Sequence, residues 1–244
     1  MTALLFLIAM FLLAPLATAR PPGPLEGDLL PPPEDPHDDR VFYEQPETPC
    51  ASRYLRGGTR MPEAPGLYTV WRPESAYARP EMVEVLTSTA EALAWARPDA
   101  DPLAVGAISK RGGGPLPGHA SHRTGLDVDV GLYREGGKVH PYGLGDIPTD
   151  EIDVEAMWIV LREMLATGLV ERILYNRHHI RRIKKHAVES GALTQEEADE
   201  LLLDLVPKDV WSRDGVVQHH RGHHDHLHVR VRCDAIPPPP DTDR

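Results

Sequence analysis

Positive charge is in short supply in this 244-residue chain, which carries 26 Lys and Arg against 37 Asp and Glu and has a formal net charge of −11. Proteins that grip a nucleic-acid backbone normally display a basic patch that neutralises its phosphates. The charge balance therefore argues against a nucleic-acid partner.

Long hydrophobic runs are missing after the first 19 residues, so we expect no later segment to span a membrane. Residues 1–19 read MTALLFLIAMFLLAPLATA, and the small-residue pattern at their end is typical of a secretory signal peptide cleaved after Ala19. A retained membrane anchor is the alternative, because the segment has no Lys or Arg before its apolar run. We expect no stable membrane association after cleavage.

Cysteine is nearly absent, since the chain has only Cys50 and Cys233. In an exported protein, their placement at the two edges of the expected domain suggests a disulfide that joins its ends. Closing so long a loop could stabilise the fold by about 4 kcal/mol in the chain-entropy model. Two free, buried thiols are the alternative.

Hydrophobic residues make up 41% of the sequence, which is enough to bury one substantial core. Residues 20–48 are rich in proline and acidic residues and favour an extended linker, and residues 236–244 form a similar proline-rich tail. We therefore expect one domain over residues 49–235.

The periodicity within this domain indicates both helices and strands. An apolar stripe that begins at Pro80 and stops before Pro98 predicts a helix over residues 80–96. Related patterns predict helices over 150–165, 177–188 and 194–205, and strands over 103–108, 126–130, 170–175 and a terminal segment that ends at 232. Residues 133–148 read as a surface loop that could border a substrate groove. This irregular order favours an α+β fold with a small, largely antiparallel sheet flanked by helices.

The most informative stretch is GHASHRTGLDVDV, residues 118–130. Leucine and valines alternate there with Asp127 and Asp129, so a strand would present both carboxylates on one face. Downstream, HHDHLHVRV at residues 223–231 places His226 and His228 on one strand face in the same way. If the two strands pair, His122, Asp129 and His228 meet.

Two imidazoles and a carboxylate are a ligand set that suits zinc, whose catalytic sites use three protein ligands and leave a fourth position open. We therefore predict Zn²⁺ bound by His122, Asp129 and His228, with a bound water of pKa near ~7. His226 is the candidate for moving the proton of that water, because it shares a strand face with His228.

Other residues are further candidates for this site. His119 and His223 could orient the base, hold substrate or bind an additional metal, and Asp127 could support a ligand histidine from behind. Arg111, in a glycine loop, could fix a substrate carboxylate. Solvated strand faces are the alternative for both motifs. Because six of the 13 histidines lie in residues 219–228, a metal-buffering tract is a further possibility.

The spacing His-x6-Asp followed by a distant His-x-His resembles the metal signature of the lysostaphin, D-alanyl-D-alanine carboxypeptidase and hedgehog group. More narrowly, KRGGG at 110–114, GHASHRTGLDVD at 118–129 and HHDHLHVRVRC at 223–233 resemble the penicillin-insensitive murein endopeptidases. The resemblance spans residues 50–233 and implies the scaffold of that group.

The resemblance implies a periplasmic zinc metallopeptidase that cuts D-alanyl-meso-diaminopimelyl cross-links in peptidoglycan. By motif position, His122, Asp129 and His228 match the zinc ligands, His226 matches the catalytic histidine, and His119 and His223 match additional active-site histidines. Family members carry more cysteines, so the pairing of Cys50 with Cys233 does not come from the resemblance. The alternatives are a carboxypeptidase or dipeptidase on the same scaffold, and a zinc-containing wall-binding module that does not cleave.

Overall fold

The computed structural model describes residues 54–139, 147–205 and 215–233. The expected signal peptide, the linker and the tail from residue 236 all lie outside these residues, as does Cys50, so these assignments and the disulfide stay predictions. Among the residues described, every helix is too short or too polar to cross a bilayer.

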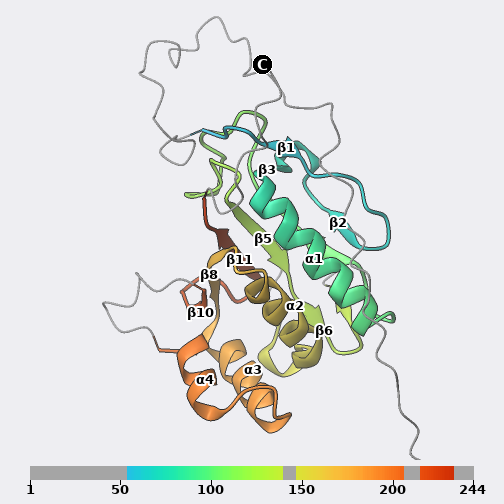
Figure 1. Cartoon of the computed structure of the whole chain (residues 1–244), viewed down its shortest axis with the longest axis vertical. Coiled ribbons are helices and arrows are strands. Elements are labelled where there is room, and N and C mark those ends of the chain that lie inside the picture. Colours follow the sequence, from blue (N-terminus) through green and yellow to red (C-terminus); the bar gives the residue numbers. More distant parts are fainter. Residues whose placement is uncertain (1–53, 140–146, 206–214, 234–244) are drawn as a thin grey trace, which may run out of the picture.

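A seven-stranded sheet forms the centre of the described domain (Figure 1). Its strands lie in the order β2 (Tyr68–Val70), β4 (Leu103–Val105), β5 (Asp127–Gly131), β11 (His226–Val231), β8 (Val170–Tyr175), β10 (Val216–His219) and β9 (Leu202–Leu203). Two small sheets join β1 (Thr59–Arg60) to β3 (Tyr77–Ala78) and β6 (Tyr133–Arg134) to β7 (Lys138–Val139).

The pairing differs between the centre of the sheet and its edges. The pairs β4–β5, β5–β11 and β11–β8 are antiparallel, whereas β2–β4, β8–β10 and β10–β9 are parallel. The α+β expectation is consistent with this mixture of helices and strands, but the expectation of a largely antiparallel sheet is wrong at both edges. The chain passes from β2 to β4 through α1, and from β8 to β10 through α3 and α4, and such long crossover connections are what parallel pairing requires.

The helices lie side by side over one face of the sheet (Figure 1). They are α1 (Pro80–Ala96), α2 (Val154–Ala166), α3 (Arg177–Glu189) and α4 (Gln195–Leu201), with short 3-10 turns at Pro73–Ser75 and Thr149–Glu151. Pro80 opens α1 as predicted, and Asp153 caps α2 by accepting a hydrogen bond from the Ala156 amide at 2.9 Å. The predicted capping box of Thr194 and Glu197 is present at the start of α4.

Several predicted elements differ in extent from the observed ones. The helix predicted over 150–165 begins only at Val154, and the one over 194–205 ends at Leu201, because Leu202 and Leu203 form β9. The strand expected over 103–108 is three residues long. The expected surface loop begins with the β6–β7 hairpin, while residues 140–146 lie outside the described chain.

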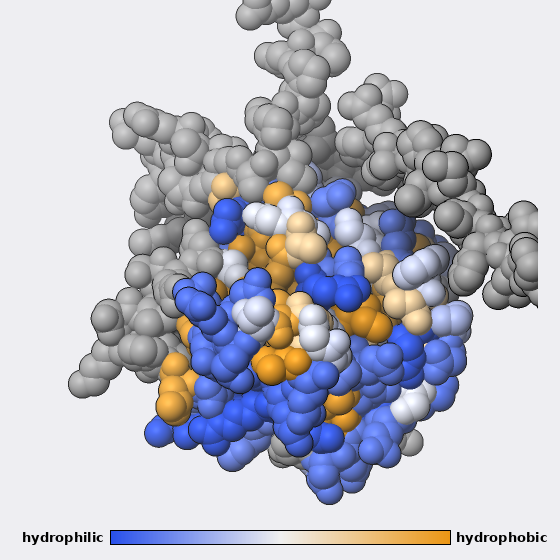
Figure 2. Space-filling view, turned by 60° about the horizontal axis from the view of Figure 1, so that its bottom comes forward, coloured by the Kyte–Doolittle hydropathy of each residue, from blue (hydrophilic) through white to orange (hydrophobic). Residues whose placement is uncertain are grey.

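The core lies between the sheet and the helices. The inner faces of β5 and β11 supply Val128, Val130, Leu227, Val229 and Val231, whose side chains are all fully buried. Since side chains alternate along a strand, the opposite face of the same two strands carries their polar residues. Elsewhere on the surface, hydrophilic residues cover most of the lower part of the view in Figure 2, with hydrophobic residues in scattered patches.

Candidate metal centre

The register of β5 and β11 brings the two sequence motifs together. His228 lies directly opposite Asp129, and Arg230 lies opposite Asp127. Directly opposed residues in an antiparallel pair point to the same face, so these four side chains share the face away from the helices. The pairing of the motif strands that the sequence predicted is therefore present.

Gly106 brings the neighbouring chain close behind Asp129. Its amide donates to the Asp129 carbonyl at 2.7 Å, and the Asp129 amide donates in turn to the Ala107 carbonyl at 3.1 Å. A Cβ at position 106 would lie 2.9 Å from that Asp129 carbonyl oxygen. The absence of a side chain at this position lets two backbones fix the point from which the Asp129 carboxylate projects.

Three side-chain atoms form a nearly equilateral triangle at this point. His122 Nε2, Asp129 Oδ1 and His228 Nδ1 are separated from one another by 3.2 Å in all three pairs. His122 and Asp129 are each 2% exposed and His228 is 8% exposed. Ligands of a tetrahedral zinc at about 2.0–2.1 Å would lie about 3.3 Å from one another, so these residues fit the ion that the sequence predicted.

His119 lies on the other side of the same carboxylate. Its Nδ1 is 3.3 Å from Asp129 Oδ2, and its ring centroid is 4.4 Å from that of His122. His119, His122 and Asp129 together offer ligand atoms that all lie within 4.8 Å of one another. Burial, followed by the nearby His122, lowers the pKa of His119 and keeps its ring nitrogens available to a metal.

A chain of charged groups supports His228 from behind. Its Nε2 is 3.1 Å from Asp127 Oδ1, and Arg230 Nη1 donates to both oxygens of Asp127 at 3.0 and 2.7 Å. Arg230 Nε also donates to Glu171 at 3.1 Å. A carboxylate behind a ligand histidine fixes the orientation of its ring and its tautomer. The position of Asp127 matches the supporting part that the sequence suggested for it.

The electrostatics of the cluster follow from its two buried carboxylates. Burial alone would raise the pKa of Asp129, but the hydrogen bonds with His122 and His228 lower it far below its usual range. Burial likewise opposes charge on His228, yet its bonds to Asp127 and Asp129 raise its pKa to about 9. The two aspartates therefore favour positive charge at this point, whether it is a proton on His228 or a bound metal ion.

His226 and His223 border the triangle. His226 Nε2 lies 3.6 Å from Asp129 Oδ1, and its Nδ1 lies 2.6 Å from Asp225 Oδ1. The His223 ring is 5.0 Å from that of His226 and 5.8 Å from that of His228, between centroids. Burial and the neighbouring His226 lower the pKa of His223 to about 4. Both predicted catalytic histidines thus lie beside the candidate ligands.

Arg111 is placed differently from the histidines. It lies exposed on a turn in the glycine loop before the first motif, where Gly112, Gly113 and Gly114 all have positive φ. Gly113 could not carry a side chain, because a Cβ would lie 2.1 Å from the Leu55 amide nitrogen. The loop is therefore packed against the chain at Leu55, and a substrate contact by Arg111 stays a prediction.

Sequence reasoning missed three polar residues of this region. Arg230 shares the strand face of His226 and His228, so the period of two could have placed it there. Asp225 adjoins His226 in the sequence, and only the turn geometry shows that their side chains meet. Glu171 comes from β8, and nothing in the sequence links it to Arg230 before the strands are paired.

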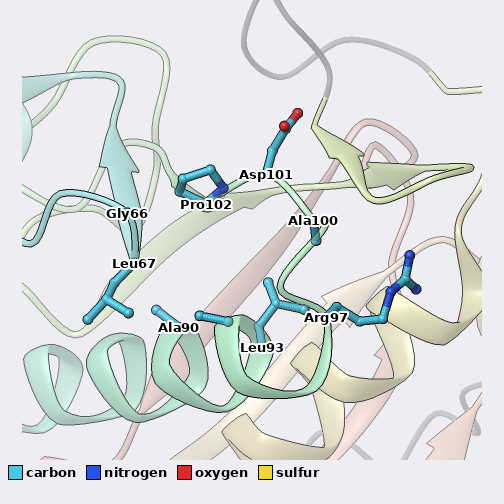
Figure 3. Close-up of a pocket in the computed structure, with 9 residues that line it drawn as sticks. Gly66, Leu67, Ala90, Leu93, Arg97, Ala100, Asp101 and Pro102 are labelled. Atoms are coloured by element: carbon cyan, nitrogen blue, oxygen red, sulfur yellow. The ribbon is translucent and has the colours of Figure 1, made fainter.

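A small pocket at the end of α1 is separate from the cluster (Figure 3). It is lined by Leu67, Ala90, Leu93 and Arg97 together with residues 100–102, and these include none of the candidate site residues. The Arg97 guanidinium is directed toward α2, where it pairs with Asp153 and Glu155. Its bonds tie two helices together.

Comparison with known proteins identifies one family. The family model described as penicillin-insensitive murein endopeptidase matches residues 50–187, which is more than half of the chain. The matched span contains His119, His122 and Asp129 and ends before β10 and β11. No curated protein matches the chain.

Proposed function

The chain belongs to the penicillin-insensitive murein endopeptidase family, and we propose that it is a zinc metallo-endopeptidase that hydrolyses D-alanyl-meso-diaminopimelyl cross-links in peptidoglycan. Family membership makes it a peptidase that acts on murein. The identity of the metal and of the bond that is cut are the proposed parts. Together with the predicted signal peptide, this substrate favours a periplasmic location. The sequence resemblance favours the scaffold of the D-alanyl-D-alanine peptidase and hedgehog group.

One observation carries the proposal: the equal 3.2 Å separations of His122 Nε2, Asp129 Oδ1 and His228 Nδ1. Three lone-pair donors directed at one small space from two strands and a loop fit a metal ion well. A solvated polar face, the alternative reading of the two motifs, would leave these side chains exposed. They are instead among the most buried polar residues described.

When bound, zinc supplies Lewis acidity toward a carbonyl oxygen and makes water more acidic. His226 takes the proton of the attacking water and passes it to the leaving amine. This transfer requires an imidazole ring that lies close to the metal ligands and is held in one orientation. Its Nε2 lies 3.6 Å from a ligand oxygen, and Asp225 orients its Nδ1 side. His223, whose ring lies beside those of His226 and His228, holds the substrate or orients the base. His119, beside Asp129, is a further metal ligand, and Arg111 holds a substrate carboxylate.

The decisive experiment offers cross-linked muropeptide dimers to the purified mature chain. Monomer products are expected, chelation should abolish them and zinc should restore them. His226→Ala should keep the metal while hydrolysis falls by roughly 10²-fold or more, which is the range for loss of a general base. His178→Ala, which removes an exposed imidazole from α3, is the matched control and should cleave normally. Loss of the metal in His226→Ala would instead make His226 a ligand.

The same experiment separates the alternative functions. Release of terminal D-alanine alone, with dimers left intact, would support the carboxypeptidase or dipeptidase. Binding of peptidoglycan without any products would support the wall-binding module. The position of His226 beside the candidate ligands favours a cleaving enzyme over that module.

A further inference from the structure

The turn between β10 and β11 directs two more histidines at one point. His220 and His223 are separated by Arg221 and Gly222, and Gly222 has a φ of 82°, in the left-handed region. His220 Nδ1 and His223 Nδ1 lie 3.1 Å apart. Both also approach the Arg221 carbonyl oxygen, at 2.7 and 3.1 Å.

These three atoms form a second triangle, smaller than the first but of the same kind. Ligands at about 2.0–2.1 Å from an ion and roughly 90° apart lie about 2.9 Å from each other, as at two adjacent positions of an octahedral or square-planar site. The three separations observed fall around this value. Two imidazole nitrogens and one carbonyl oxygen would leave the remaining positions to water.

The turn is held in place before any ion binds. The His220 amide donates to the Tyr175 carbonyl at 3.0 Å, and the Arg177 amide donates to His219 Nδ1 at 3.1 Å. On the other side, His224 hydrogen-bonds through its backbone to the buried His179 of α3. A ligand pair on a fixed turn loses less conformational freedom on binding a metal than one on a free loop.

We propose that His220 Nδ1, His223 Nδ1 and the Arg221 carbonyl form a second divalent-metal site, distinct from the site of His122, Asp129 and His228. Imidazole ligands favour Zn²⁺, Ni²⁺ and Cu²⁺, whereas Mg²⁺ and Ca²⁺ prefer oxygen. With three protein ligands, one of them a neutral carbonyl, this site binds zinc more weakly than the first, which has a carboxylate.

The second site has a consequence for activity, and this part rests on the proposed function. His223 is a ligand of the second site and also a neighbour of the proposed catalytic His226, because the two rings lie 5.0 Å apart. An ion on Nδ1 of His223 places a positive charge beside the proton-transferring histidine and holds the His223 ring. Zinc beyond the first equivalent therefore inhibits hydrolysis, so the activity of the enzyme falls as the surrounding zinc concentration rises.

Metal counting tests the second site without reference to activity. The metal-free full chain is titrated with zinc by calorimetry, and the bound metal is measured by elemental analysis. The wild type should bind two ions, one tightly and one weakly. His220→Ala and the more conservative His220→Gln should bind only the tight ion, while His224→Ala, which removes an exposed imidazole from the same turn, should bind two.

Each other outcome overturns the second site. A single ion in the wild type, two ions in both His220 variants, or loss of the tight ion in either variant would be incompatible with a separate site. In the activity arm, excess zinc should inhibit the wild type and His224→Ala several-fold more than His220→Ala. If no chain cleaves dimers, the proposed function fails while the metal count still decides the site.

Discussion

The two faces of the sheet each bury a histidine, and they affect its charge in opposite ways. His228 lies on the face with the candidate ligands, and bonds to Asp127 and Asp129 raise its pKa to about 9 in spite of burial. His179, on α3, stacks on Tyr175 with the rings 5.0 Å apart. Tyr175 adjoins Leu174, the partner of His228, and so points to the other face.

His179 shows what burial does without a carboxylate. It is 1% exposed, its Nδ1 has no hydrogen-bond partner among the described residues, and burial lowers its pKa to about 4. The surroundings of His179 thus disfavour charge, while the face with two aspartates attracts a cation, whether a proton or a metal ion. The difference between the faces comes from the carboxylates, since both histidines are buried.

Removing the central carboxylate should have the largest effect. Asp129→Ala deletes one of three ligands and the oxygen that contacts His122, His226 and His228. We expect loss of the tightly bound zinc and of hydrolysis to background, measured by elemental analysis and by cleavage of dimeric muropeptides. Glu135→Ala, which removes an exposed carboxylate, should change neither. Metal content near one per chain in Asp129→Ala would show that the ligand set is wrong.

The stability of the metal-free chain at alkaline pH tests the raised pKa of His228, on the sheet face with the candidate ligands. Because the pKa of His228 is raised from 6.5 to about 9, its stabilisation is fully present below pH 6.5 and is lost as the pH rises through 9. The shift corresponds to roughly 3 kcal/mol at most. Urea unfolding between pH 6 and 10 should show this loss in the wild type and little of it in His228→Gln. Parallel profiles for the two proteins would contradict the charged pair.

The stability of the chain at acid pH tests the lowered pKa of His179, on the sheet face that the helices cover. Because the pKa of His179 is lowered to about 4, the unfolded chain takes up a proton that the folded chain excludes. Stability is therefore lost as the pH falls from 6.5 toward 4, by up to roughly 3 kcal/mol. His179→Phe keeps a ring against Tyr175 and should flatten this part of the urea profile. An unchanged acid slope would show that burial does not lower the pKa of His179.

The smallest effect is expected away from both faces, at the capping box of α4. Thr194→Ala removes the hydroxyl that accepts from the Glu197 amide at 3.2 Å. The free energy of unfolding should fall by about 1 kcal/mol, as is typical for loss of a cap. Thermal unfolding and the zinc titration measure the result, and neither pH slope nor metal content should change. A change in either would mean that α4 is coupled to the site.

Local patterns were enough to predict much of the fold. The helix that begins at Pro80, the strand Val170–Tyr175 and the capping box are confirmed, because caps, prolines and apolar spacing act over a few residues. β10 was missed and the end of α4 was extended too far. Both concern two- to four-residue strands whose pairing partners, not their own residues, make them strands.

The sequence by itself determined which residues share a face. Alternation along a strand sets Asp127 with Asp129 and His226 with His228, whatever the rest of the chain does. Only the tertiary structure decided that Asp129 lies opposite His228, that Arg230 lies opposite Asp127 and that the loop returns His122 to the same point. Register is fixed by contacts between residues about a hundred positions apart, and a slip of one residue would turn one strand's polar side chains toward the core.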